Sequence, residues 1–207
     1  MNAGFFTFWL LGLAGILVLT GWRRELLGTV RLRALLVFGV VWAVLLPVNW
    51  ALTSTLSIRL SLVWQMGWAI GCLLLAKLRS QALYHLFATA IVGALVYWIR
   101  VLYLYDPVFV VIHPFWDTAL AAGLLAGILS PLFAVQFSIL TLALALAQLL
   151  LHRSAMLHIP LGSASWQDGF FAALAIARTV SGMAAIAAHL RTRLAPYWLG
   201  EDGGGSS

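Results

Sequence analysis

Long apolar stretches alternate with short polar breaks along the whole chain. Each stretch is about 20 residues long, which is the length that an α-helix needs to cross roughly 30 Å of hydrocarbon. The pattern therefore predicts an all-α fold, a polytopic membrane helix bundle with about seven transmembrane helices. The predicted helices cover residues 2–22, 34–52, 60–76, 82–105, 108–129, 132–151 and 169–190.

The connections between the predicted helices leave no room for a separate soluble domain. The longest connection, residues 152–168, mixes apolar and polar side chains and is expected to lie along the membrane interface. We therefore expect a single transmembrane domain over residues 1–200. The glycine- and serine-rich residues 201–207 are expected to form a flexible tail.

The composition agrees with a membrane protein, because 63% of the 207 residues are apolar and 9% are charged. A water-soluble domain of this size needs more polar residues to cover its core. Twelve Lys and Arg residues against six Asp and Glu residues give a net charge of +6. In a soluble protein this excess would suggest nucleic acid, but here the basic residues lie mostly in short connections between apolar stretches. We therefore expect the lipid bilayer as the partner, and no nucleic acid.

The basic residues are distributed unevenly between alternate connections. By the positive-inside rule, the connections that are richer in Lys and Arg face the cytoplasm. Seven crossings then place the N-terminus outside and the C-terminus in the cytoplasm. The basic residues assigned to the cytoplasmic side are Arg23, Arg24, Arg31, Arg33, Lys77, Arg79, Arg191 and Arg193, and those on the other side are Arg59 and Arg153.

Ionisable residues within or next to the predicted helices are candidates for function, because charge is costly in hydrocarbon. Asp117 and Arg178 each lie about nine residues into their predicted helices, at a depth of roughly 14 Å, where they could pair. With Asn49 and Gln65 in the same outer half, these residues predict a polar pocket open to the outside. The candidate cluster consists of Arg100, Asp106, His113, Asp117 and Arg178.

Pro114 leaves two interpretations of this region open. If the helix continues through Pro114, then His113 and Asp117 are four residues apart on one face, and the carboxylate raises the affinity of the imidazole for a proton. If Pro114 begins the helix, His113 belongs to a loop and Asp117 to the first turn. A purely structural role is the alternative to a ligand or proton site, with opposite charges that fix the helix register.

Two glycine pairs, Gly67 with Gly71 and Gly123 with Gly127, have the spacing that lets helix backbones approach closely. We expect these pairs chiefly to pack helices inside the bundle. The alternative is an interface with a second copy of the chain or with another membrane protein.

No motif points to an enzyme. The patterns G-x-S-x-G, H-E-x-x-H and the P-loop do not occur in the sequence. Cys72 is the single cysteine, which excludes an internal disulfide and a cysteine metal cage. The sequence therefore predicts no metal and no cofactor, and an enzyme that acts on lipid is the weakest of the function classes considered.

A short segment carries a family resemblance. Residues 102–108 read L-Y-L-Y-D-P-V, and His113 and Trp116 follow. This Y-D-P-V pattern, together with the chain length and the apolar content, resembles the YphA-like family of membrane proteins from endospore-forming bacteria. The resemblance implies a multi-pass protein of the bacterial cytoplasmic membrane and implies no particular activity.

Two functional hypotheses follow from these observations. The first is a non-enzymatic structural or assembly component of the bacterial membrane, in which the charged cluster holds helices together. The alternative is a small-solute or proton-coupled transporter, in which His113 and Asp117 exchange protons and Arg178 binds an anion or resets the carboxylate.

Overall fold

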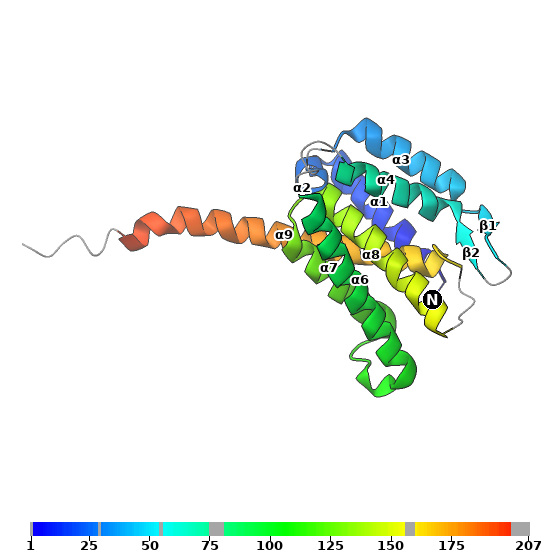
Figure 1. The fold of residues 1–207 in the computed structure, drawn as a ribbon. Coiled ribbons are helices and arrows are strands. Elements are labelled where there is room, and N and C mark those ends of the chain that lie inside the picture. The colour runs from blue at the N-terminus through cyan, green and yellow to red at the C-terminus, as the bar shows by residue number, and fades with distance from the viewer. Residues whose placement is uncertain (1, 29, 54–55, 75–80, 156–159, 200–207) are drawn as a thin grey trace, which may run out of the picture.

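The structure of the chain, a computed structural model, is mostly helical (Figure 1) and describes residues 2–28, 30–53, 56–74, 81–155 and 160–199. Lys77, Arg79 and the predicted tail of residues 201–207 lie outside the described residues. The long helices are α1 Phe5–Leu19, α3 Leu32–Leu45, α4 Leu60–Leu74, α6 Ala82–Tyr105, α7 Pro114–Leu129, α8 Phe133–Ala155 and α9 Ala164–Leu199. The short elements are α2 Arg23–Leu27, η1 Pro107–Phe109, β1 Asn49–Ala51 and β2 Ser57–Arg59.

Each predicted apolar stretch overlaps one long helix, and α6 has the predicted bounds. The prediction of helix over residues 46–52 is wrong. The helix α3 ends at Leu45, and β1 pairs with β2 in an antiparallel hairpin in which Trp50 lies opposite Ile58. Pro47 accounts for the early end, because proline has no amide hydrogen to donate and disfavours helical geometry in the residue before it.

The helices α7 and α9 begin at other residues than the sequence predicted. The helix α7 starts at Pro114, which is six residues later than predicted, and His113 is its N-cap. The helix α9 starts at Ala164 and runs for 36 residues. The predicted interfacial segment of residues 152–168 is therefore partly the end of α8 and the start of α9. These shifts decide which polar side chains share a depth.

Successive long helices run in opposite directions through the bundle. The helix α8 lies in the middle and packs against α4, α6, α7 and α9. We call the end that holds residues 46–60, 106–113 and 160–163 the hairpin end, and the end that holds residues 20–31 and 130–132 the arginine end. The hairpin β1–β2 and the helix α2 lie at opposite ends of the bundle (Figure 1), and α9 continues past the arginine end.

Hydrogen bonds and ring contacts hold each end together. At the hairpin end, the backbone of Leu161 pairs with that of Ile58, and the ring of Phe6 stacks on Phe115 with centroids 5.7 Å apart. At the arginine end, Arg178 donates hydrogen bonds to the backbone carbonyls of Glu25 and Pro131. Both ends therefore bring together residues that are more than a hundred positions apart in sequence.

The helix lengths divide into two groups. The helices α6, α8 and α9 are long and apolar enough by themselves to cross a membrane. The helices α1, α3, α4 and α7 are apolar but have only 14 to 16 residues. At about 1.5 Å per residue, the shorter group spans about 21 to 24 Å, which is less than the roughly 30 Å of a typical hydrocarbon core.

One glycine pair packs as expected and the other does not. A Cβ atom on Gly123 would lie 2.5 Å from the carbonyl oxygen of Ala173, and one on Gly127 would lie 2.9 Å from that of Ala177. This confirms that the Gly123 pair lets α7 and α9 approach closely. The expectation of internal packing is wrong for Gly67 and Gly71, because a Cβ atom there would meet nothing within 4 Å.

Candidate functional site

Asp117 ties the α6–α7 connection together. It lies in the first turn of α7, as Pro114 begins the helix, and its carboxylate accepts a hydrogen bond of 2.8 Å from the hydroxyl of Tyr103 on α6. The backbone amides of Val111 and Ile112 also donate to it, at 3.0 and 3.2 Å. These bonds explain how one carboxylate orders the turn between the two helices.

Asp106 and His113 make local caps within the same connection. The carboxylate of Asp106 accepts a hydrogen bond of 3.1 Å from the amide of Val108 and so caps η1. The Nδ1 atom of His113 accepts one of 3.2 Å from the amide of Phe115. His113 lies on the surface of the bundle, outside the helix, so it does not share a helix face with Asp117.

Arg100 and Arg178 join helices at opposite ends of the bundle. Arg100 on α6 donates a hydrogen bond of 2.9 Å to the side-chain oxygen of Gln148 on α8. Arg178 on α9 donates one of 2.9 Å to the carbonyl of Pro131 and one of 3.3 Å to the side-chain oxygen of Gln136. It also bonds the carbonyl of Glu25, so it connects α9 with α8, the α7–α8 turn and α2.

The structure therefore brings only part of the predicted cluster together: Asp106, His113 and Asp117 lie at the α6–α7 connection, and Arg100 and Arg178 bond elsewhere. Asp117 lies at the start of α7, whereas Arg178 is level with Gly127 near the end of that helix, where Ala177 approaches most closely. Ten residues of helix separate Asp117 from Gly127, which is about 15 Å. The predicted Asp117–Arg178 pair fails because α7 starts later and α9 earlier than the apolar pattern suggested.

The two predicted pocket residues also differ in their positions. Asn49 lies in β1, opposite Arg59, on the surface of the hairpin and not on a helix. Gln65 lies on α4 and has an exposed fraction of 0%, so it belongs to the interior and not to a pocket open to the outside.

Asp168 is a charged residue that the sequence analysis missed. It is buried near the start of α9, and its carboxylate accepts three hydrogen bonds of 2.7 Å, from the amide of Gly4 and from the amide and hydroxyl of Thr7. The carboxylate thus caps the first turn of α1, where the helix dipole favours negative charge. The sequence placed Asp168 in a connection, so its burial could not be read from hydropathy.

A second set of polar side chains is buried without partners. We define the polar core as Ser61 and Gln65 on α4, Thr141 on α8 and Gln167 on α9. Their exposed fractions are 0 to 1%, and none of their side-chain oxygen or nitrogen atoms is hydrogen-bonded to another described residue. Buried polar groups are nearly always paired in native structures, so this cluster is unusual.

The register of α4 on α8 places two of these side chains at one depth. The hydroxyl of Ser138 donates a hydrogen bond of 2.9 Å to the carbonyl of Ala69. The helices α4 and α8 run in opposite directions. A step of one turn toward lower residue numbers on α4, from Ala69, and one toward higher residue numbers on α8, from Ser138, therefore both move toward the hairpin end. Gln65 and Thr141 lie one turn along these two helices and are therefore level with each other.

Contacts of α9 bring Gln167 to the same region. The indole of Trp166 donates a hydrogen bond of 3.4 Å to the carbonyl of Leu144, which is about one turn along α8 from Thr141. Gln167 shares a helix face with Phe171, whose ring lies 5.5 Å from that of Trp42 on α3. The polar core therefore lies among α3, α4, α8 and α9, near the unpaired indole nitrogen of Trp42.

The chemistry of the polar core is uncharged. It offers amide and hydroxyl groups, which both donate and accept hydrogen bonds, and it holds no ionisable side chain. Such a set suits water or a small neutral solute and lacks a general base. Among the described residues, no group of three His, Cys, Asp or Glu side chains is arranged to hold a metal ion.

The model of the YphA-like integral membrane protein family matches residues 3–198. The chain belongs to this family. The match confirms the resemblance that residues 102–108 indicated, and it covers every helix from α1 to the α9 segment within the bundle. No curated protein and no solved structure matches the chain.

Family membership makes the chain an integral membrane protein. The surface side chains of α1, α3, α6 and α9, such as Phe8, Val44, Phe87 and Met183, are therefore expected to face lipid and not water. In hydrocarbon, the charged side chains described above depend on their hydrogen-bond partners within the protein, because no water is present to replace these partners.

Proposed function

We propose that this YphA-like protein is a non-enzymatic structural or assembly component of the bacterial cytoplasmic membrane. In this proposal its seven long helices cross the bilayer, with the N-terminus outside and the C-terminus in the cytoplasm. The alternating helix directions support seven crossings. The charge distribution supports the orientation, because Arg23, Arg24, Arg31 and Arg33 lie at the arginine end, whereas Arg59 and Arg153 lie at the hairpin end.

Two charged side chains of α9, those of Asp168 and Arg178, carry the proposed structural role. Asp168 binds the first turn of α1, and Arg178 binds α2, which follows α1 in the chain. The segment of α1 and α2 is thus held at both ends by α9. Arg100 and Asp117 hold α6 to α8 and to the start of α7 in the same way. Charges that are engaged in helix contacts are not available for substrate.

The polar core supports a second candidate function, the passage of a small uncharged solute through the bundle. This candidate differs from a proton-coupled transporter, because His113 and Asp117 lie at the start of α7 and are not part of the polar core. Unpartnered amide and hydroxyl groups inside a membrane bundle would stabilise a neutral hydrogen-bonding solute along its path.

One experiment separates the two functions. We would reconstitute the chain and its Gln65→Leu and Gln167→Leu variants into vesicles and measure water, glycerol and urea flux by light scattering. A structural role predicts flux equal to that of empty vesicles in every case. It also predicts unchanged or higher thermal stability, because an apolar side chain replaces an unpaired buried amide.

The matched control is Gln148→Leu, which makes the same chemical change at a paired glutamine. This variant leaves the guanidinium of Arg100 without its partner and is expected to lose about 2 to 3 kcal/mol of stability. The opposite outcome is solute flux through the unaltered chain that Gln65→Leu abolishes and Gln148→Leu preserves. That result would contradict a purely structural role and support solute passage.

A further inference from the structure

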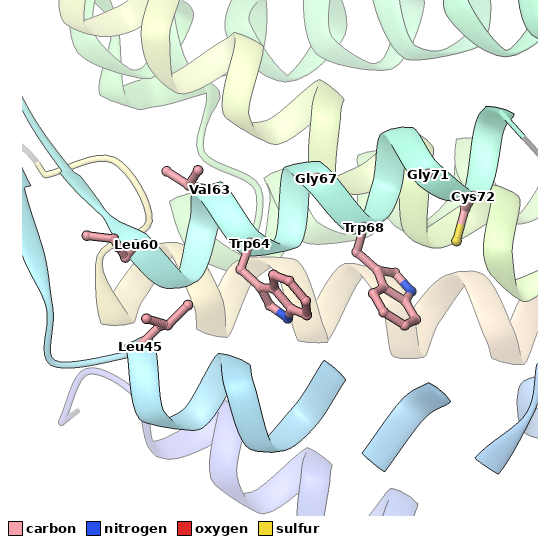
Figure 2. A pocket seen from close by; sticks show the side chains of 8 residues that line it. All are labelled: Leu45, Leu60, Val63, Trp64, Gly67, Trp68, Gly71 and Cys72. Atoms are coloured by element: carbon pink, nitrogen blue, oxygen red, sulfur yellow. The ribbon is translucent and has the colours of Figure 1, made fainter. Parts of the chain in front are cut away.

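An apolar groove runs along the surface of the bundle between α3 and α4, with a volume of about 560 Å³ (Figure 2). It is lined chiefly by α4, and the indoles of Trp64 and Trp68 project into the space between the two helices. Gly67 and Gly71 leave it open, because a Cβ atom on either would meet nothing within 4 Å. The groove faces the membrane, so its occupant lies within hydrocarbon.

The lining of the groove is almost entirely apolar and favours an apolar occupant. The indole nitrogen of Trp64 is engaged in a hydrogen bond of 3.2 Å to the carbonyl of Phe38. The groove extends from Leu60 to Cys72. That distance is about 18 Å at about 1.5 Å per residue, and one leaflet of hydrocarbon is about 15 Å deep. The length therefore suits one extended acyl chain.

Positive charge lies at one end of the groove. The rings of Phe38 on α3 and Trp68 on α4 are 5.4 Å apart, which fixes the register of the two helices. Counting along α3 from Phe38 places Arg31 and Arg33 just beyond the Cys72 end of the groove. Both arginines are exposed, and the structure gives Arg31 no capping hydrogen bond to its own helix.

The surroundings of these two arginines are also basic. The neighbouring helix α2 adds Arg23 and Arg24, and Glu25 is the acidic residue among the described residues of the arginine end. This excess attracts an anionic lipid headgroup, as basic clusters at the membrane surface do.

We propose that the groove binds an anionic phospholipid, with one acyl chain along Gly67 and Gly71 and the phosphate against Arg31 and Arg33. The site goes beyond the proposed structural role and does not depend on it. A neutral phospholipid would fill the same groove without the charge contact. A second copy of the chain would fill it with a helix.

Lipid retention in detergent tests the proposal. The purified full chain is mixed with phosphatidylglycerol or with phosphatidylcholine, and bound lipid and oligomeric state are read by native mass spectrometry. We expect phosphatidylglycerol to be retained at least about fivefold more than phosphatidylcholine. Gly71→Leu, which fills the groove, should abolish the difference. Arg31→Gln should reduce phosphatidylglycerol retention about fivefold and leave phosphatidylcholine unchanged.

Two control variants keep the result interpretable. Gly12→Leu adds the same bulk on α1, at a position where a Cβ atom also meets nothing within 4 Å, and should retain lipid normally. Arg153→Gln removes an exposed charge from the last turn of α8, at the opposite end of the bundle, with the same expectation. Equal retention of the two lipids would overturn the proposal. A dimer that dissociates in the Gly71→Leu variant would also overturn it, because the groove would then bind a second copy of the chain.

Discussion

Four charged side chains of the bundle, those of Arg100, Asp117, Asp168 and Arg178, are each stabilised by hydrogen bonds to uncharged groups of neighbouring elements. Asp168 is the clearest case, because it is buried among three donors and no described cation pairs with it. The amides at the start of α1 supply both hydrogen bonds and the positive end of the helix dipole. A buried carboxylate is tolerated where its oxygens are fully engaged in this way.

Asp168→Asn should therefore destabilise the protein by about 2 to 4 kcal/mol. The amide keeps one acceptor oxygen but presents an NH2 group to donors of α1, so it loses hydrogen bonds and charge together. Thermal unfolding followed by circular dichroism in one detergent measures the change. Asp106→Asn is the control, because Asp106 makes a single cap bond, and it should cost about 1 kcal/mol. Equal costs for the two variants would contradict this account.

The sequence identified most of the ionisable residues but not their partners. Arg100, Asp117 and Arg178 were expected to form one pocket, and they instead make separate contacts. Arg100 bonds α8, Asp117 bonds α6, and Arg178 bonds α8 and the α7–α8 turn. The partners are largely neutral groups, namely glutamine oxygens, a tyrosine hydroxyl and backbone carbonyls and amides. Such groups occur throughout the chain, so a search for opposite charges at equal depth did not find them.

Among the helices, the close approach of α7 and α9 depends on Gly123 and Gly127. Both helices run the same way, and their backbones meet where α7 has no side chain. Gly67 and Gly71 have the same spacing in sequence but face the open groove of α4. The spacing alone marks a smooth helix face, and the tertiary structure decides whether another helix covers it.

Gly123→Ala should lower stability by about 1 to 3 kcal/mol, because the added Cβ would lie 2.5 Å from a backbone oxygen that cannot turn away. Gly71→Ala should leave stability unchanged or raise it by up to about 1 kcal/mol, since alanine favours helix over glycine. Unfolding midpoints of the two variants in the same detergent compare them directly. A loss at Gly71 as large as that at Gly123 would show that the groove is covered in solution.

The positions of the helix ends show where hydropathy stops being informative. The helix α6 has the predicted bounds because basic or proline-containing segments limit it at both sides. The helix α3 ends at Leu45, shortly before Pro47, and α7 begins late at Pro114, inside stretches that hydropathy predicted as continuous helices. Hydropathy measures burial in lipid and does not distinguish helix from hairpin, whereas proline acts on the backbone itself.

At the scale of the molecule, α8 is the axis around which the other helices are arranged, and α9 fastens α1, α2 and α7 to it. The polar core lies on the side of α8 that faces α3 and α4, while the lipid groove lies outside the same pair of helices. Four short helices surround this axis, so the bundle suits a thin hydrocarbon layer or one that adapts around it.

The proposed orientation gives a direct labelling prediction. In a Cys72→Ala background, Val108→Cys lies in η1 at 87% exposure, and Arg24→Cys lies in α2 at the other end. A membrane-impermeant maleimide should label Val108→Cys in intact cells and Arg24→Cys only after permeabilisation. The reverse pattern would show that the topology is inverted. Labelling of both positions in intact cells would contradict an odd number of crossings between Arg24 and Val108.

The sequence by itself determined that this is an integral membrane protein, which family it belongs to and roughly where its long helices lie. These properties depend on hydrophobic length and local motifs, which each segment carries independently of the rest. Only the tertiary structure decided which polar groups meet. That outcome depends on the starting residue, direction and rotation of every helix at once, and a shift of five or six residues separated Asp117 from Arg178. It also left the amides of Gln65 and Gln167 among the unpaired polar groups of the interior.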